Sequence, residues 1–177
     1  MSDPKTVAQL QTDRDEHVAK LAELIADVRI CMLTTVDYDG KPWSRPMATQ
    51  EAEFDGDLWF FTRDDSEKVE HVGRNRKVGV AFARPDRQDY VTMAGTALVV
   101  KDRDKAEELW SEPLKAWFPK GLDDPHLRLL KVEVERAEYW DSPSSPVVYA
   151  LGYLKAQITG EKAGPGGVAG ENEKVDL

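Results

Sequence analysis

The middle of the chain alternates short apolar runs with turn residues. Residues 30–36 (ICMLTTV) carry no charge and include β-branched side chains, residues 58–62 (LWFFT) form a similar run, and another segment begins after Pro42. The connections at 37–40 and 55–56 both end in glycine, which readily adopts the positive φ of tight turns. This pattern predicts a three-stranded β-meander.

Three more segments have the character of strands. Residues 78–82 and 90–100 are mostly apolar or β-branched, and residues 130–135 alternate apolar with charged positions before continuing to Trp140. Gly95 falls inside the second segment, where glycine indicates a β-bulge or a close approach of two backbones. The alternating segment is typical of a strand with one solvated face. The sequence therefore predicts a mainly β (α+β) protein with six strands.

Helical patterns flank these strands. Apolar residues recur with a period near 3.6 over residues 6–28, which predicts an amphipathic helix that packs on the sheet. A second helix is expected to begin after the N-cap signature at 63–68. A third helix, with a capping box formed by Asp104 and Glu107, is expected to be interrupted by Pro113.

The end of the chain differs in composition from the rest. Residues 147–159 carry a partial apolar stripe, which predicts a last helix. From Gly160 onward the chain is rich in Gly, Ala, Glu and Lys and has little to bury, so residues 161–177 are predicted to be a disordered tail. Residues 1–160 contain no repeat and no linker, and they are predicted to form one domain with a single core.

The charge balance limits the classes of partner. The chain has 24 Lys and Arg residues against 33 Asp and Glu residues, which gives a net charge of -9. Such a surface repels nucleic acids and anionic membranes, so we expect neither as a partner. The chain shows no basic and apolar leader and no apolar run long enough for a membrane span, which predicts a cytoplasmic protein.

Cysteine and histidine are too sparse to indicate a metal site. Cys31 is the single cysteine, so internal disulfides are excluded, and its place in an apolar strand predicts a buried hydrophobic residue. His17, His71 and His126 are far apart in sequence and show no zinc-ligand spacing. We therefore expect no metal.

One segment has the features of an anion site. Ser66 and Lys68 lie at the predicted start of a helix, where unpaired N–H groups and the helix dipole favour a phosphate. Asp64, Asp65 and Glu67 lie in the same turn and would repel an anion unless they point away. The alternative interpretation is a capped surface helix with no ligand.

A family resemblance favours the phosphate site. The chain resembles the pyridoxamine 5′-phosphate oxidase-like proteins, which are flavin-binding split barrels, and within them the general stress protein branch. The resemblance rests on the order and spacing of four short segments between residues 30 and 141, namely Ser44-Arg45-Pro46-Met47, Phe61-Thr62, Ser66 with Lys68, and Ala137-Glu138-Tyr139-Trp140-Asp141. It implies a six-stranded antiparallel split β-barrel with flanking helices, which forms a homodimer with two FMN sites at the subunit interface.

The resemblance also implies roles for particular residues. Ser66 and Lys68 would hold the FMN phosphate, and Arg45, Pro46 and Met47 would address the isoalloxazine ring. Phe61, Thr62 and Trp140 would line the pocket, with Trp140 as an aromatic wall.

Three functions remain open from the sequence. The first is a flavin-dependent oxidoreductase with a small-molecule substrate that the sequence does not identify, in which the flavin carries the chemistry. The second is a flavin-binding stress or sensor module without turnover, and the third is the same fold with the deazaflavin F420 or haem. No residue stands out as a catalytic acid or base.

Oxidation of pyridoxamine 5′-phosphate itself is not expected. The resembling oxidases carry a Ser-Arg-Lys run before the helix, and here Glu67 stands where they have arginine. They also continue from the tryptophan into an Arg-x-His-x-Arg segment, whereas Trp140 is followed by Asp-Ser-Pro-Ser-Ser-Pro. A substrate phosphate would therefore lack its cationic partners, unless Arg84, Arg87 or Arg136 substitutes from elsewhere in the fold.

Overall fold

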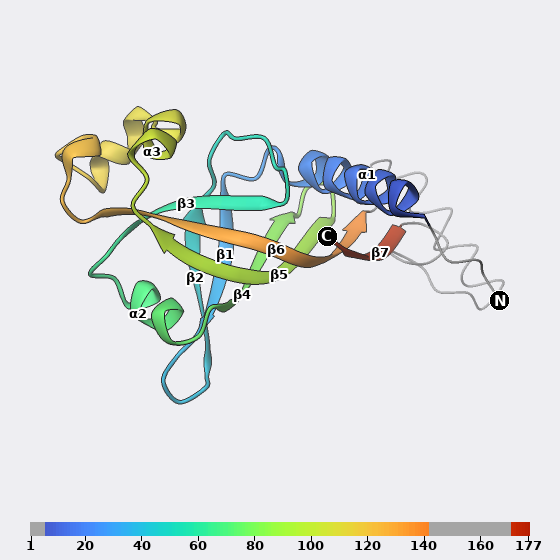
Figure 1. Ribbon diagram of the computed structural model, residues 1–177, viewed down its shortest axis with the longest axis horizontal. Coiled ribbons are helices and arrows are strands. Elements are labelled where there is room, and N and C mark those ends of the chain that lie inside the picture. Colours follow the sequence, from blue (N-terminus) through green and yellow to red (C-terminus); the bar gives the residue numbers. More distant parts are fainter. Residues whose placement is uncertain (1–5, 142–170) are drawn as a thin grey trace.

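The computed structural model describes residues 6–141 and 171–177 of the 177-residue chain (Figure 1). The strands are β1 (Ile30–Val36), β2 (Pro42–Ala48), β3 (Asp57–Arg63), β4 (Lys77–Arg84), β5 (Asp89–Val100), β6 (Leu127–Asp141) and β7 (Glu171–Asp176). The helices are α1 (Val7–Ile25), α2 (Glu67–Arg74) and α3 (Arg103–Leu109), followed by 3-10 helices at Glu112–Ala116 and Gly121–Asp123. None of the helices in these residues is long and apolar enough to cross a membrane.

The seven strands form one antiparallel sheet. Their order is β2-β1-β4-β5-β6-β3, and β7 pairs with β6. β2 and β3 stand at the two ends of this order, and the sheet curls until they come near each other without pairing. The predicted split barrel is confirmed, with one strand more than expected.

The additional strand corrects the prediction for the end of the chain. β6 pairs with β3 over 127–133 and with β7 over 136–141, so β7 covers the part of β6 that β3 does not reach. Val175 is buried, and the Tyr139 hydroxyl donates to the Glu173 carboxylate at 2.5 Å. The predicted disorder over 161–177 is therefore wrong for β7, because an open strand edge supplies backbone partners that composition does not reveal. The predicted helix at 147–159 lies outside the described residues.

Gly95 has the role that its position in the strand predicts. The register between β5 and β6 shifts between Ala94 and Gly95, which marks a β-bulge. A Cβ atom at Gly95 would lie 2.1 Å from the carbonyl oxygen of Glu133, so only glycine fits this approach of the two backbones. The glycines of the two meander turns, Gly40 and Gly56, adopt the expected positive φ angles of 78° and 112°.

The core fills the inside of the curled sheet. Inward residues of neighbouring strands meet there, among them Leu33, Phe60, Val80 and Leu130, all almost fully buried. Cys31 belongs to the same cluster, and burial raises the pKa of its thiol to about 12. A thiol with this pKa stays protonated at neutral pH, so the prediction of a buried hydrophobic cysteine is confirmed.

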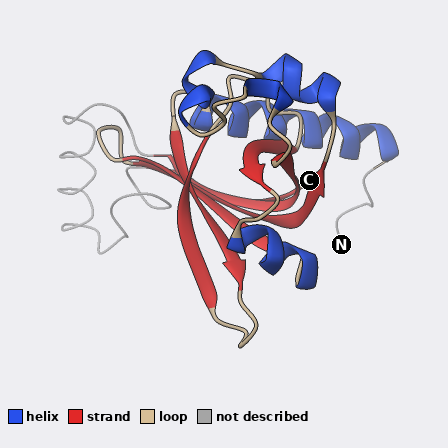
Figure 2. Cartoon of the chain, turned by 90° about the vertical axis from the view of Figure 1, so that its left-hand side faces the viewer, coloured by secondary structure: helices blue, strands red, loops and turns tan. Residues whose placement is uncertain are grey.

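The helices cover the sheet unequally. In Figures 1 and 2, α1 and α3 lie on one side of the sheet and α2 on the other. In α1, Leu21 and Leu24 are buried, whereas Val7 is 86% exposed and Leu10 is 55% exposed. The expected packing over 6–28 therefore holds only for the second half of the helix.

A second, smaller core lies under the segment that follows β5. Phe61 of β3 packs there against Trp110 and Phe118, with ring centroids 5.7 and 6.2 Å apart. The helix break predicted at Pro113 is confirmed, since a 3-10 helix replaces α3 there. The predicted capping box of Asp104 is wrong, because Asp102 caps α3 by accepting from the Lys105 backbone N–H at 3.0 Å.

Candidate functional site

The main candidate site is a cavity at the seam between β2 and β3, the two end strands of the sheet, which do not pair with each other. β2 and β3 are both edge strands here, and a cavity of about 490 Å³ separates their ends. An edge strand keeps free backbone N–H and C=O groups, and the prolines of β2 are tolerated because an edge strand needs fewer ladder bonds. The cavity is lined by Ile30, Arg45, Pro46, Met47, Ala48, Gln50, Phe61, Thr62, Arg63, Ser66, Lys68, Leu114, Trp117 and Phe118.

Seven of the eight predicted site residues meet in this cavity. Arg45, Pro46 and Met47 come from β2, Phe61 and Thr62 from β3, and Ser66 and Lys68 from the start of α2. Trp140 does not line it, since it lies near the end of β6, paired with Tyr90 of β5 and Asn172 of β7. Within one chain, the predicted aromatic wall is therefore not formed by Trp140.

Two cationic side chains face the cavity without a carboxylate partner. Within the described residues, Lys68 makes no ion pair or hydrogen bond, and Arg45 makes only a hydrogen bond to Thr35. Burial, and then the nearby positive charge of Arg45, lower the pKa of Lys68 below its usual value. Two like charges held together at a partly buried position are unfavourable alone, and an anion between them would relieve the repulsion.

The hydroxyl groups beside Lys68 complete the polar end of the cavity. The Ser66 hydroxyl donates to the Arg63 carbonyl oxygen at 2.8 Å and lies 3.2 Å from the Thr62 hydroxyl. Ser66 is the N-cap residue of α2, yet its side chain does not cap the helix. Within the part of the chain that the structure describes, the first N–H groups of α2 therefore have no side-chain acceptor, as is common where a helix N-terminus receives an anion.

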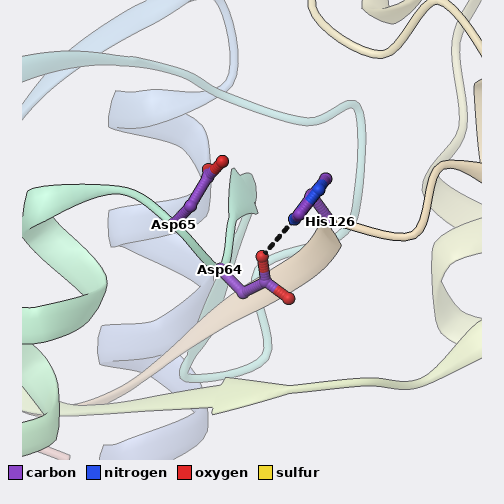
Figure 3. A group of neighbouring side chains, drawn as sticks. All are labelled: Asp64, Asp65 and His126. Carbon is purple, nitrogen blue, oxygen red and sulfur yellow. Dashed lines mark hydrogen bonds and ion pairs between the residues drawn. The ribbon is translucent and has the colours of Figure 1, made fainter.

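Two of the three acidic residues of the same turn, Asp64 and Asp65, are already paired. The Asp64 carboxylate faces the His126 imidazole at 2.8 Å (Figure 3) and also pairs with Arg128. Asp65 accepts two hydrogen bonds from the Arg63 guanidinium, both of 3.0 Å. Their negative charge is thus largely compensated by these partners, which removes the objection for Asp64 and Asp65. Glu67, the third acidic residue of the turn, has a side chain that is 75% exposed.

These three residues also form the one cluster of potential metal ligands in the described part of the chain. Asp64, Asp65 and His126 place their ligand atoms within 4.8 Å of one another. The hydrogen bond from His126, followed by the charge of Arg128, lowers the pKa of Asp64, and the bond from Arg63 lowers that of Asp65. Since Arg63 and Arg128 occupy the carboxylates, the cluster is an ion-pair network that ties the β3–α2 turn to β6.

An apolar wall of the cavity was missed in the sequence. Leu114, Trp117 and Phe118 lie opposite β2, and Trp117 is 74% exposed at the rim. The only signal was the density of aromatic residues between 110 and 118, which most often indicates a core, although aromatic residues are also enriched at interfaces. Leu114 and Phe118 are buried in the smaller core, so packing in that core holds this wall of the cavity in place.

The other basic residues after α2 lie away from the cavity. The Arg74 guanidinium stacks 3.9 Å over the Tyr38 ring, and Lys77 bonds to Glu135 at 2.9 Å. These two basic side chains are therefore engaged at the helix end and with its neighbours, not in the cavity.

Comparison with known proteins identifies the family. The profile described as pyridoxamine 5′-phosphate oxidase like matches residues 16–164, which is most of the chain. The chain belongs to this family. The predicted resemblance to pyridoxamine 5′-phosphate oxidase-like proteins is therefore confirmed.

Individual relatives place the chain near the general stress proteins of this family. General stress protein 26 of Bacillus subtilis is 30% identical over 121 residues, which are 66% of this chain and 82% of that protein. A candidate general stress protein 26 from Jannaschia sp. CCS1 superposes with a TM-score of 0.73 at 23% identity, over 92% of this chain and 99% of that one. A general stress FMN/FAD binding protein from Xanthomonas citri superposes with a TM-score of 0.63 at 29% identity, over 74% of this chain and 92% of that one.

Proposed function

We propose that this protein binds FMN in the seam cavity and acts as a flavin-dependent oxidoreductase of the general stress protein type. The observation that carries the proposal is the placement of Lys68 and Arg45, two cations without a carboxylate partner in the described residues, in a cavity whose other walls include the apolar side chains of Phe61, Leu114 and Phe118. This division matches a ligand with one anionic end and one flat apolar end. The similarity to a flavin-binding protein of Xanthomonas citri supports the same assignment.

Each end of the cavity has a distinct task in this proposal. Lys68 and Ser66, with the start of α2, would hold the phosphate. Arg45 and the free backbone groups of β2 would form hydrogen bonds with the polar edge of the isoalloxazine ring. Phe61 would support the apolar face of the ring, since it is fixed by its aromatic neighbours. A bound flavin supplies electron or hydride transfer, and the protein contributes binding, orientation and exclusion of water.

Titration with three flavins tests the phosphate site. FMN, FAD and riboflavin are added to the purified protein, and the quenching of Trp117 at the cavity rim reports binding. FMN is expected to bind at least about tenfold more tightly than riboflavin, because a charge-assisted bond contributes roughly 1.5–3 kcal/mol. Equal affinity for riboflavin and FMN would overturn the phosphate site. The absorbance spectrum of the protein distinguishes a flavin from F420 or haem.

A flavin-binding stress or sensor module without turnover is the second candidate. The observation that favours it is the absence of any histidine or carboxylate among the described residues that line the cavity. Such a lining offers no acid or base for a substrate, so all chemistry would fall to the flavin. Oxidation of NADH or NADPH with multiple turnovers of an electron acceptor supports the enzyme, and binding without turnover supports the module.

We also propose that the protein works as a homodimer. Outward residues of four adjacent strands form a row across the sheet, Pro46, Met32, Ala81 and Thr92, all of them exposed and uncharged. The neighbouring outward positions Ile30, Ala48, Ala83 and Ala94 are also exposed and uncharged. An uncharged patch across four strands is unusual on a protein of net charge -9, and a second copy of the chain would cover it.

The proposed dimer face reaches the cavity. Ile30, Pro46 and Ala48 belong to this face and also line the cavity, so a partner subunit would close the cavity mouth. Sedimentation is expected to show a dimer at micromolar concentration, and Met32→Glu is expected to dissociate it and weaken FMN binding. Val7→Glu introduces the same group at an exposed position of α1 and serves as the control. A wild-type monomer that still binds FMN tightly would contradict the shared site.

Oxidation of pyridoxamine 5′-phosphate is not part of the proposed function. The Glu67 side chain, at the position of the oxidases' arginine, is 75% exposed and cannot replace a phosphate donor. Arg84, which could substitute from elsewhere, is held by Asp89 at 2.9 Å. Mixing the FMN-loaded protein with pyridoxamine 5′-phosphate in air is expected to give no multiple turnover to pyridoxal 5′-phosphate.

A further inference from the structure

The Arg45 side chain is held by a buried hydroxyl group. Its Nη1 donates to the Thr35 hydroxyl at 2.7 Å, and Thr35 is completely buried. Leu33 is the direct cross-strand partner of Arg45, so Thr35 is its diagonal neighbour on the inner face of β1. Among the described residues, this is the one hydrogen bond that orients the guanidinium, and no carboxylate contributes an ion pair.

The hydroxyl is in turn fixed by a buried histidine. Thr35 Oγ1 lies 2.9 Å from His71 Nδ1, and His71, which comes from α2, is 1% exposed. Since Arg45 can only donate, the Thr35 oxygen accepts that bond, and its own hydrogen is free to point to His71. The arrangement that satisfies most of these groups therefore has Nδ1 as the acceptor and the imidazole hydrogen on Nε2.

The second ring nitrogen of His71 supports this assignment. Nε2 is buried and has no hydrogen-bond partner, but the Glu67 carboxylate lies 3.9 Å away on the preceding turn of α2. A nearby carboxylate favours a hydrogen on Nε2. The edge of the Tyr38 ring packs against the imidazole with centroids 5.7 Å apart, and Tyr38 is itself held by Glu70 and Arg74.

We propose that Thr35 and His71 are positioning residues that orient the Arg45 guanidinium in the seam cavity, and that they do so only while His71 is neutral. The proposal rests on the proposed FMN site. If His71 gained a second proton, both of its nitrogens would donate, and the Thr35 oxygen would face two donors with no acceptor for its own hydrogen. The Arg45 bond would then weaken.

The groups around His71 act on its protonation in opposite directions. Glu67 and Glu70 of α2 favour the charged imidazole, whereas Arg45 of β2 and Arg74 at the end of α2 oppose it. The Tyr38 hydroxyl is engaged by Glu70 at 2.5 Å and does not reach the ring nitrogens as a partner. Acidification is therefore expected to disturb the Arg45 orientation without any change in Arg45 itself.

A double-mutant cycle with FMN as the probe separates positioning from general destabilisation. Thr35→Val removes the hydroxyl at almost constant volume and is expected to weaken FMN binding roughly five- to twentyfold. Thr35→Ser keeps the hydroxyl and is expected to stay within about twofold of the wild type. In the background of Arg45→Ala, Thr35→Val should have no further effect, because the residue through which it acts is gone.

The pH profile of FMN binding gives a second readout. His71→Asn keeps an acceptor at the place of Nδ1 but cannot be protonated, so it should bind FMN normally at about pH 7.5 and lose less affinity than the wild type at about pH 5.5. Titration of the FMN phosphate affects both proteins equally and cancels in this comparison. Thermal melts of all variants confirm that they are folded.

The possible outcomes distinguish this proposal from the function on which it rests. If the wild type does not bind FMN, both are overturned. If Lys68→Ala weakens binding but Thr35→Val does not, the FMN site stands and the positioning role is overturned. An equal effect of Thr35→Val with and without Arg45, or identical pH profiles of the wild type and His71→Asn, would also overturn it.

Discussion

The turn from β3 to α2 has two sides that both carry charged side chains. On one side these charges are paired, and on the other side they are not. On one side, Asp64 and Asp65 are paired with Arg128, His126 and Arg63. On the other side, Lys68, which follows Asp64 by four residues, and its spatial neighbour Arg45 face a cavity without any carboxylate partner among the described residues. The paired side stabilises the fold, and the unpaired side is available to a ligand.

This difference shows that pairing matters more than the number of charges. Residues 63–68 contain three acidic and two basic residues, a balance that would repel a phosphate if all the charges pointed the same way. The distribution of partners compensates Asp64 and Asp65 on the outer side, whereas Lys68 and Arg45 keep their positive charge at the cavity. The predictions below change one side at a time.

The largest effect is expected from the unpaired side. Lys68→Ala should weaken FMN binding roughly ten- to 150-fold, since it removes a charge-assisted bond in a partly buried site. The measurement is a fluorescence titration with FMN. Lys77→Ala removes the same charge from an exposed lysine that pairs with Glu135, and it should leave the affinity unchanged. Similar affinities for wild type and Lys68→Ala would mean that Lys68 is only a solvated helix residue.

The pH dependence of FMN binding should reveal the lowered pKa of Lys68. Burial and the charge of Arg45 shift the pKa of Lys68 below the ordinary 10.5, and only the charged form of Lys68 can pair with the phosphate. FMN affinity should therefore fall as the pH rises, starting below 10.5, and be about halved where Lys68 is half deprotonated. Lys68→Arg keeps its charge over this range, so its affinity should stay level. A decline in both proteins would point to another group.

A smaller effect is expected from the paired side. Asp65→Asn removes a negative charge that lies near Lys68, so FMN should bind slightly more tightly, by at most about fivefold. The same titration at low and high salt checks the cause, because an exposed charge acts through screened electrostatics. A loss of affinity comparable to that of Lys68→Ala would show that Asp65 belongs to the binding site.

The smallest effect concerns stability. The pKa of Asp64 lies below its usual value, because the carboxylate accepts from His126 and faces Arg128. Such a group stabilises the fold above its unfolded pKa, and this stabilisation is lost as the pH falls through the folded pKa. Asp64→Asn should therefore melt a few degrees lower than the wild type at neutral pH, and the difference should shrink at about pH 3. A constant difference would indicate a contribution other than charge.

The local alternation of residues was sufficient to predict most of the sheet. The two glycine turns, the strands around Leu33 and Phe60, and the bulge at Gly95 follow from side-chain period and backbone conformation, which are properties of a few neighbouring residues. The family and the site residues followed instead from the resemblance of four short segments, and seven of the eight residues that it implied meet in the cavity. β7 was missed, because its stability depends on an open edge of β6 that no local pattern announces.

Only the tertiary structure decided which charges are compensated. Asp64 meets His126 and Arg128 across 62 and 64 positions of sequence, and Arg45 is oriented by Thr35 and His71, which belong to other elements. The sequence by itself determined that a helix start with a serine and a lysine follows a polar strand end, since both lie within one short segment. Whether the lysine of that segment faces a cavity or a carboxylate depends on long-range packing. A charge is compensated only by groups that the fold brings within a few ångströms.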